Sequence, residues 1–306
     1  MSRAPLAFLV LCVAACGSTQ ADGAGGSPDA GNGGASGADS GGGGLLIGGD
    51  GGGVDGGLPD QNGCTAAANL VYVVSSDAMA LYSFYPPTLT FTKIGQLACG
   101  AQSVPFSMSV ARDGTAWILY QNGRLYRAST KDASCTPTSF VAGQSGFQTF
   151  GLGFSADSAG STQETLYACW KQGLAKIDTD TLALTPIGTV PGITLTAGCD
   201  LTGTGDGLLF SFIPQSTQWL IATLDKTSSA PTFQKSLTPP IPAGGSWGTS
   251  YWGGSLYLYT QTPTAPGSTV WRFNPADGTT TKLKDNIGFS IVGAGESTCA
   301  PTVPVK

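Results

Sequence analysis

The sequence predicts an all-β protein: a five-bladed β-propeller closed by its C-terminal strand and preceded by a disordered Gly-rich linker. Two short alternating patterns recur five times after residue 64, and strands rich in small residues separate the copies. A spare strand of the small-residue type ends the chain. Alternation is typical of half-buried strands, and units of about 47 residues with four strands are typical of propeller blades.

The two recurring patterns define the second and third strands of each predicted blade. The first pattern joins an aliphatic residue to an aromatic one, and its copies are Val71-Tyr72, Ala116-Trp117, Leu166-Tyr167, Leu209-Phe210 and Leu256-Tyr257. The second follows a few residues later, and its copies cover residues 81–84, 125–128, 174–177, 221–224 and 270–273. Turn residues such as Asp178, Asp225 and Asn274 follow the second pattern, so we expect a hairpin there.

Strands rich in Gly, Ser and Ala are predicted to lie innermost. They cover residues 106–110, 150–154, 196–199 and 247–251. Strands at the axis of a radial array are crowded, which favours small side chains. The first unit lacks such a strand, but residues 289–295 supply one at the end of the chain. We therefore expect the C-terminal strand to complete the first blade and close the ring.

The ends of two repeats resemble known propeller families. Residues 174–181 and 271–278 are similar to the repeat ends of quinoprotein-like and NHL-like propellers, and the resemblance extends over residues 69–299. No single family's motif is complete. A β-sandwich, a β-solenoid and another number of blades are the alternative architectures.

The composition excludes several classes of function. The 306 residues include 14 Lys and Arg, 19 Asp and Glu, and no His. Without His there is no Ser-His-Asp or Cys-His catalysis and no His-ligated metal. Residues 64–306 carry 13 basic against 13 acidic residues, with no basic stretch dense enough to hold nucleic acid phosphates. We expect no nucleic-acid partner and no cofactor.

Residues 1–15 are predicted to be an export signal. The apolar run Leu6–Val13 is too short to span a bilayer and follows a basic start. Val13-Ala14-Ala15-Cys16 resembles the lipobox of bacterial lipoproteins, which implies cleavage before Cys16 and lipidation of its thiol. In such lipoproteins Asp after the Cys often signals inner-membrane retention, so Gly17 implies lipid anchoring at the outer membrane of a bacterial cell envelope. An ordinary secretory signal is the alternative.

Residues 16–63 are predicted to be the lipidated Cys and a disordered tether, and residues 64–306 the propeller domain. The segment 17–63 contains 20 Gly and six Asp but no aromatic residue. Such a segment buries too little apolar surface to offset the entropy of ordering it. The tether is expected to hold the propeller away from the lipid surface, so that the membrane is contacted through the anchor alone.

Six cysteines remain in the predicted domain, and an even number in an exported chain indicates disulfides. Six cysteines allow fifteen pairings, which the propeller arrangement narrows. Cys64 precedes the first strand and Cys299 follows the closing strand, so this pair is expected to lock the ring. Bridges between adjacent blades would then pair Cys99 with Cys135 and Cys169 with Cys199. There is no CxxC spacing to indicate a metal or redox site.

Candidate ligand-facing residues include one aromatic cluster and several polar residues near the predicted axis. Trp247, Tyr251 and Trp252 are suited to stacking on sugars or holding a protein partner, and packing between blades is the alternative. Glu296 follows the closing strand and could face the central channel. It lacks the second carboxylate that glycoside hydrolysis requires. The polar candidates on innermost strands are Ser107, Ser109, Thr249 and Ser250.

Two further polar stretches are interpreted as turns. Residues 200–207 carry Asp200 and Asp206, but their spacing does not match an EF-hand loop, so we predict a tight turn between strands and no metal site. Arg112-Asp113-Gly114 lies between two predicted strands and is likewise expected to be a turn.

The predicted function is a cell-envelope lipoprotein that displays a noncatalytic propeller for binding an envelope protein, a glycan or another ligand. The missing His, the two Glu and the long tether favour this hypothesis. A metal-assisted propeller enzyme acting on carbohydrates or lactones is one alternative, and a sugar-binding lectin is another. A lectin of this kind would be expected to repeat its site in each unit, and the Trp cluster is not repeated.

Overall fold

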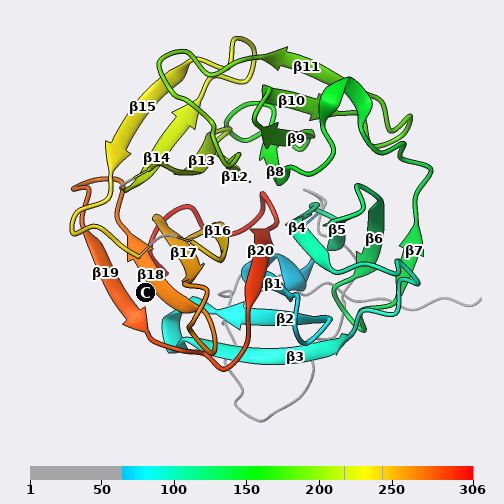
Figure 1. Ribbon diagram of the computed structural model, residues 1–306, viewed down its shortest axis with the longest axis horizontal. Helices are drawn as coiled ribbons and strands as arrows, with labels where there is room; N and C mark the ends of the chain where they lie inside the picture. Colours follow the sequence, from blue (N-terminus) through cyan, green and yellow to red (C-terminus); the bar gives the residue numbers. More distant parts are fainter. Residues whose placement is uncertain (1–63, 217, 243, 306) are drawn as a thin grey trace, which may run out of the picture. The chain divides into compact units, whose positions relative to one another are not determined.

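The computed structural model describes residues 64–305, except 217 and 243. These residues form twenty strands and three short 3-10 helices, η1 Ala66–Asn69, η2 Pro86–Thr88 and η3 Gln144–Gly146, with no α-helix among them. The strands make five four-stranded antiparallel sheets around a common axis (Figure 1). The predicted five-bladed propeller is confirmed, which excludes the sandwich and solenoid alternatives. The predicted signal, the lipidation site Cys16 and the Gly-rich tether lie outside the described residues.

Blades one and two are built as the repeats predict. Blade one has the order β20-β1-β2-β3, with bounds Ile291–Glu296, Val71–Ser75, Ala80–Tyr85 and Thr90–Gln96. Blade two has the order β4-β5-β6-β7, with bounds Pro105–Val110, Thr115–Tyr120, Leu125–Ser129 and Cys135–Pro137. Both recurring patterns fall inside the second and third strands of these blades.

Blades three to five repeat the arrangement. Blade three contains β8 Gly151–Ala156, β9 Glu164–Trp170, β10 Gly173–Ile177 and β11 Leu184–Gly188. Blade four contains β12 Asp200–Gly203, β13 Leu209–Pro214, β14 Trp219–Leu224 and β15 Pro231–Ser236. Blade five contains β16 Ser246–Trp252, β17 Ser255–Gln261, β18 Thr269–Phe273 and β19 Thr280–Lys284. Within the described part of the chain, no helix is long and apolar enough to cross a membrane.

One predicted innermost strand was wrong in position. The strand expected at residues 196–199 is β12, which begins at Asp200. Gly198 adopts a φ of +81°, and a Cβ at this position would lie 2.1 Å from the Trp170 ring, so this stretch cannot continue as a strand. The correction moves Asp200 from a predicted turn onto the axis of the propeller, while Asp206 lies in the turn that follows β12.

Small residues at the axis allow the close approach of neighbouring innermost strands. A Cβ on Gly293 of β20 would lie 2.6 Å from the Met108 backbone nitrogen of β4. A Cβ on Gly203 of β12 would lie 2.2 Å from the Phe154 carbonyl oxygen of β8. Backbone packs directly against backbone at these positions, which explains the enrichment of Gly in the innermost strands.

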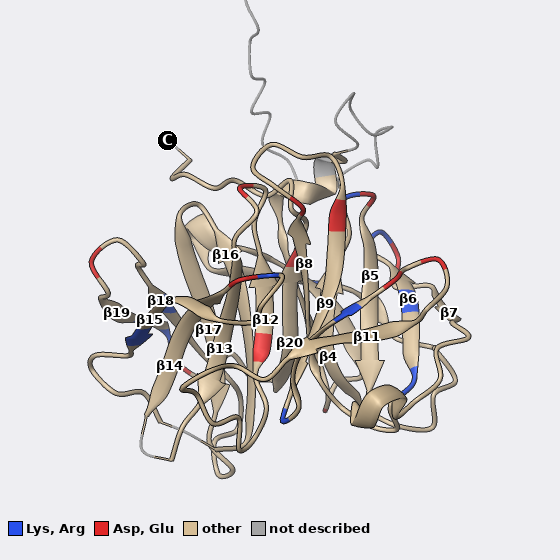
Figure 2. Ribbon diagram, turned by 90° about the horizontal axis from the view of Figure 1, so that it is seen from above, with Lys and Arg blue, Asp and Glu red and all other residues tan. Residues whose placement is uncertain are grey.

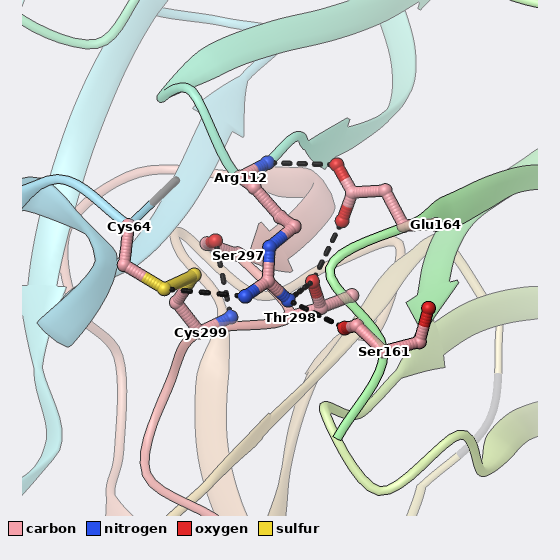
Figure 3. Close-up of a disulfide and its surroundings, with 7 residues drawn as sticks. All are labelled: Cys64, Arg112, Ser161, Glu164, Ser297, Thr298 and Cys299. Atoms are coloured by element: carbon pink, nitrogen blue, oxygen red, sulfur yellow. Dashed lines mark hydrogen bonds between the residues drawn. A yellow bond between two sulfur atoms is a disulfide. The ribbon is translucent and has the colours of Figure 1, made fainter. Parts of the chain in front are cut away.

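The two ends of the domain close the ring. β20 pairs antiparallel with β1, with Val71 opposite Glu296, and the predicted Cys64–Cys299 disulfide joins the segments that flank these strands. The Arg112 guanidinium donates to Thr298 Oγ1 (3.0 Å), and Thr298 Oγ1 donates to Glu164 Oε2 (2.7 Å) (Figure 3). The other two predicted disulfides, Cys99–Cys135 and Cys169–Cys199, are also confirmed.

Candidate functional site

The five innermost strands run in the same direction and give the propeller two different faces. We call the face where these strands begin the cavity face, and the face where they end the lock face. The lock face carries the Cys64–Cys299 disulfide and the turn that contains Arg112 (Figure 3). In the side view, the described chain enters and ends on the lock side (Figure 2).

A cavity of about 260 Å³ lies at the mouth of the central channel on the cavity face. All five innermost strands contribute to its lining, through Val292, Phe106, Ser107, Gly151, Asp200, Ser246 and Trp247. Trp170, at the end of β9, completes the aromatic part of the wall. A site at this position depends on closure of the ring, because the last strand of the chain supplies part of the wall.

Three half-buried aromatic rings form the walls of the cavity. The Phe106 and Trp170 rings pack edge to face at 5.7 Å between centroids. The Trp247 ring packs in the same way at 5.7 Å from Trp219, which is fully buried. Trp170 also lies against Gly198, beside the Cys169–Cys199 disulfide. These contacts fix the rings before any ligand arrives.

Asp200 and Ser107 form the polar floor of the cavity. Ser107 Oγ donates to Asp200 Oδ1 (3.1 Å), and the Thr249 backbone N–H donates to Asp200 Oδ2 (2.8 Å). Ser107 Oγ in turn accepts from the Leu152 N–H (3.0 Å). Burial raises the pKa of Asp200 to about 8, because the charged carboxylate is poorly solvated there. Among the described residues that line the cavity, Asp200 is the only one with an acidic or basic side chain.

Glu296 is a second buried carboxyl group, at the end of β20. It does not line the cavity. Thr202 Oγ1 of β12 donates to its Oε1 (2.5 Å), while Oε2 is buried without a hydrogen-bond partner in the described structure. Burial raises the pKa of Glu296 to about 8, and the nearby Asp200 adds to this shift. Glu296 therefore joins β20 to β12 and lies outside the lining of the cavity.

The predicted aromatic cluster is divided between two environments. Trp247 lines the cavity, whereas Tyr251 and Trp252 are buried between blades. Tyr251 stacks on Phe210 with centroids 5.4 Å apart, and Trp252 Nε1 donates to the Asn69 carbonyl (2.9 Å). Tyr251 and Trp252 thus pack between blades, which is the alternative to ligand contact that the sequence analysis gave for this cluster.

The predicted polar set is also divided. Ser107 lines the cavity, while Ser109, Thr249 and Ser250 are buried outside its lining. Ser109 Oγ accepts from the Phe154 N–H (2.8 Å), and Ser250 Oγ lies 3.1 Å from Tyr259 Oη. The Ser109 and Ser250 hydroxyl groups thus join neighbouring strands.

Sequence reasoning missed Asp200, Phe106 and Trp170. One signal for Phe106 was present, since Phe106 and Trp247 are both the second residue of an innermost strand. Asp200 was hidden by the misplaced fourth inner strand. No local pattern marks Trp170, whose position depends on the conformation of Gly198.

A larger and more open depression of about 580 Å³ lies on the lock side, between blades two and three. Four of its charged side chains, those of Arg112, Asp113, Arg127 and Glu164, already have partners within the protein. The Arg127 guanidinium lies 4.4 Å from the centroid of the Trp117 ring and donates to the Thr179 carbonyl (2.8 Å). The Arg112 backbone N–H donates to Glu164 Oε1 (2.8 Å). These contacts make the smaller cavity the stronger candidate site.

Among residues 64–305 there is no group of three or more His, Cys, Asp or Glu that could hold a metal ion. No protein-family model matches the chain. No curated protein matches it in sequence.

Solved structures with a similar fold include a protein of unknown function from Bacteroides thetaiotaomicron, at 13% identity and a TM-score of 0.46, with 71% of this chain and 56% of that chain covered. The WD40 domain of Neurospora crassa Pan2 gives 11% identity and a TM-score of 0.40 over 71% of this chain and 63% of that chain. Myxococcus xanthus glutaminyl cyclase gives 13% identity and a TM-score of 0.39, over 74% and 75%. The match thus spans little more than half of the first of these chains, and the likeness concerns the fold alone.

Proposed function

We propose that this protein is a lipid-anchored protein of the bacterial cell envelope that displays a noncatalytic propeller and binds a small ligand in the cavity. The observation that carries the proposal is the placement of the cavity opposite the face where the chain enters the domain. Cys64, the first described residue, is held on the lock face by its disulfide, so the preceding chain is attached there and not at the cavity face.

A binding role fits the chemistry of the cavity better than a catalytic one. Asp200 is the only acidic residue in the part of its lining that the structure describes, and each of its carboxyl oxygens accepts a hydrogen bond from the protein. Hydrolysis of a glycoside requires two carboxyl groups on either side of the scissile bond. Glu296, the other buried carboxyl group of the channel, is not part of the lining.

Two steps test the proposal. First, Cys16→Ala is expected to move the protein from the membrane pellet to the soluble fraction, whereas an ordinary secretory signal would leave the distribution unchanged. Second, the full-length protein is incubated with a small-molecule extract of the producing cells, and retained compounds are identified by mass spectrometry after filtration.

The second step has a matched pair of variants. Trp247→Leu removes an aromatic wall of the cavity and is expected to abolish retention. Phe233→Leu changes an exposed ring on β15, the outer strand of blade four, and is expected to leave retention unchanged. Equal loss in both variants, or no retained compound with the wild type, contradicts the proposed site.

A further inference from the structure

We propose that the cavity binds the ammonium group of a small organic cation, held between the rings of Phe106, Trp170 and Trp247 and the carboxylate of Asp200. This inference rests on the proposed function, because it names the chemistry of the ligand that the cavity accepts.

The charge of the cavity is the first argument. Asp200 is the only ionisable side chain among the described residues of its lining, which include no Lys or Arg. Among the described residues, the only ion pair joins Lys282 and Asp285 on the surface, so Asp200 has no cationic partner there. A carboxylate oxygen can accept more than one hydrogen bond, and each oxygen of Asp200 accepts one from the protein. A bound cation would pair with the Asp200 carboxyl group and favour its ionised form over the neutral form that burial favours, whereas an anion would find no positive group in the described lining.

The aromatic walls are the second argument. The faces of Trp, and less strongly of Phe, attract cations within about 6 Å of the ring centroid. Trp170 already attracts one in this structure, since Lys171 Nζ lies 5.7 Å from the centroid of its ring. Lys171 is not part of the cavity lining. Cages of aromatic rings recognise quaternary ammonium groups, and here the rings line the same cavity as Asp200.

The size of the cavity is the third argument. Its volume of about 260 Å³ lies just below the usual range of about 300–1,000 Å³ for ligand pockets. This volume suits a compact headgroup of the size of choline or tetramethylammonium. A sugar is the competing ligand, because Ser107, Gln121 and Ser246 offer some hydrogen bonds. The two candidate ligands, an organic cation and a neutral sugar, therefore differ in charge, and a test can separate them on that property.

The test compares choline with 3,3-dimethylbutan-1-ol, its neutral isostere, by titration calorimetry. The full-length protein is used in a detergent without an ammonium headgroup. We expect saturable binding of choline that is at least roughly tenfold tighter than binding of the neutral alcohol. Equal affinity for the two compounds, or binding of neither choline nor tetramethylammonium, would overturn the inference.

Two isosteric variants separate the cavity from the channel. Asp200→Asn removes the group that can ionise opposite a cation but keeps the side-chain shape, and is expected to weaken choline binding roughly tenfold or more. Glu296→Gln changes the buried carboxyl group outside the cavity and is expected to alter the affinity by less than roughly twofold. Equal weakening in both variants contradicts direct contact between Asp200 and the cation.

The outcomes distinguish this inference from the proposed function. If neutral compounds from the cell extract bind and Trp247→Leu abolishes their binding, the cavity is a ligand site but the ammonium inference fails. If nothing is retained from the extract and no ammonium compound binds, both fail. Co-sedimentation with phosphatidylcholine vesicles that exceeds co-sedimentation with phosphatidylglycerol vesicles, and that is weakened by Asp200→Asn, would identify a lipid headgroup as the source of the cation. Binding of free choline without this difference would identify a soluble one. Both of these results support the inference.

Discussion

The two faces of the propeller are made from opposite ends of the same five strands, yet they differ in how their polar groups are used. On the lock face, the Arg112 side chain and the Glu164 carboxylate both form hydrogen bonds with Thr298, and the Arg112 backbone N–H donates to Glu164 (Figure 3). A disulfide joins the two ends of the domain on the same face. On the cavity face, aromatic rings remain half-buried and Asp200 has no described cationic partner. The polar groups of the lock face are therefore engaged in closing the ring, while those of the cavity face remain available for a ligand.

Removing the ring-closing disulfide is expected to have the largest effect on stability. Cys64 and Cys299 are 235 residues apart, and the chain-entropy model gives a contribution of about 5 kcal/mol for so long a loop. We expect the variant with Cys64→Ser and Cys299→Ser to lose about this free energy of unfolding in urea titrations. Choline affinity under native conditions is expected to be unchanged, because the lock lies on the opposite face.

The Cys99–Cys135 bridge provides the control for loop length. It spans 36 residues, for which the same model gives about 4 kcal/mol. If serine substitutions at the ring-closing pair cost clearly less than those at Cys99 and Cys135, the closing strand is held chiefly by its pairing with β1.

The pH dependence of stability is expected to be the next largest effect. Burial raises the pKa of Asp200 and of Glu296 to about 8, against ordinary values near 4. The folded state keeps these protons over a pH range in which the unfolded chain has lost them. The free energy of unfolding is therefore expected to fall as the pH rises from about 4 to about 8 and to level off above that, by roughly 3 kcal/mol or more.

The variants Asp200→Asn and Glu296→Gln show how much each carboxyl group contributes to this fall in stability with pH. The groups that pack against Asp200 from the neighbouring strands are Ser107, Gly151 and Thr249, which do not titrate. Asp200 in turn raises the pKa of Glu296 through charge. Chemical unfolding across pH 5 to 9 (roughly the window of these pKa shifts) is expected to show a smaller decline in Asp200→Asn and in Glu296→Gln. A stability that rises over this range in the wild type contradicts the assignment of buried neutral carboxyl groups.

The architecture was predictable because local sequence patterns that repeat in every blade determine it. The alternation around Tyr72 or Tyr257 predicts a strand in each repeat. The small residues of the closing strand and the positions of the cysteines restrict how the strands can be arranged. Together they predicted the closure by β20 and all three disulfides. Errors of a few residues in single strands did not change the ring.

The site was less predictable because it depends on backbone details that have no repeated pattern. Asp200 lies at the axis only because the chain turns at Gly198 and starts β12 two residues later. Trp170 reaches the cavity because Gly198 leaves room for its ring. A single turn of irregular chain thus decides which carboxylate and which indole face the ligand.

Close packing at the axis predicts a moderate effect at Gly203. A Cβ there would lie 2.2 Å from the Phe154 carbonyl, so the backbones of β8 and β12 must move apart. We expect Gly203→Ala to cost about 2 kcal/mol in thermal or urea unfolding. Gly188→Ala in β11, where the nearest atom is the Ser229 hydroxyl at 3.2 Å, is expected to cost clearly less. Equal losses would argue against tight contact between the innermost strands.

The smallest effect on stability is expected at the residue most important for binding. Trp247 and Trp252 lie on the same strand, β16, but Trp247 is half-buried at the cavity and Trp252 is 6% exposed between blades. Trp252→Leu is expected to cost about 3 kcal/mol in free energy of unfolding, and Trp247→Leu only about 1 kcal/mol. Choline binding is expected to follow the opposite order, with complete loss in Trp247→Leu alone. If Trp247→Leu destabilises as much as Trp252→Leu and keeps the ligand, its ring belongs to the core and the cavity face is not a binding face.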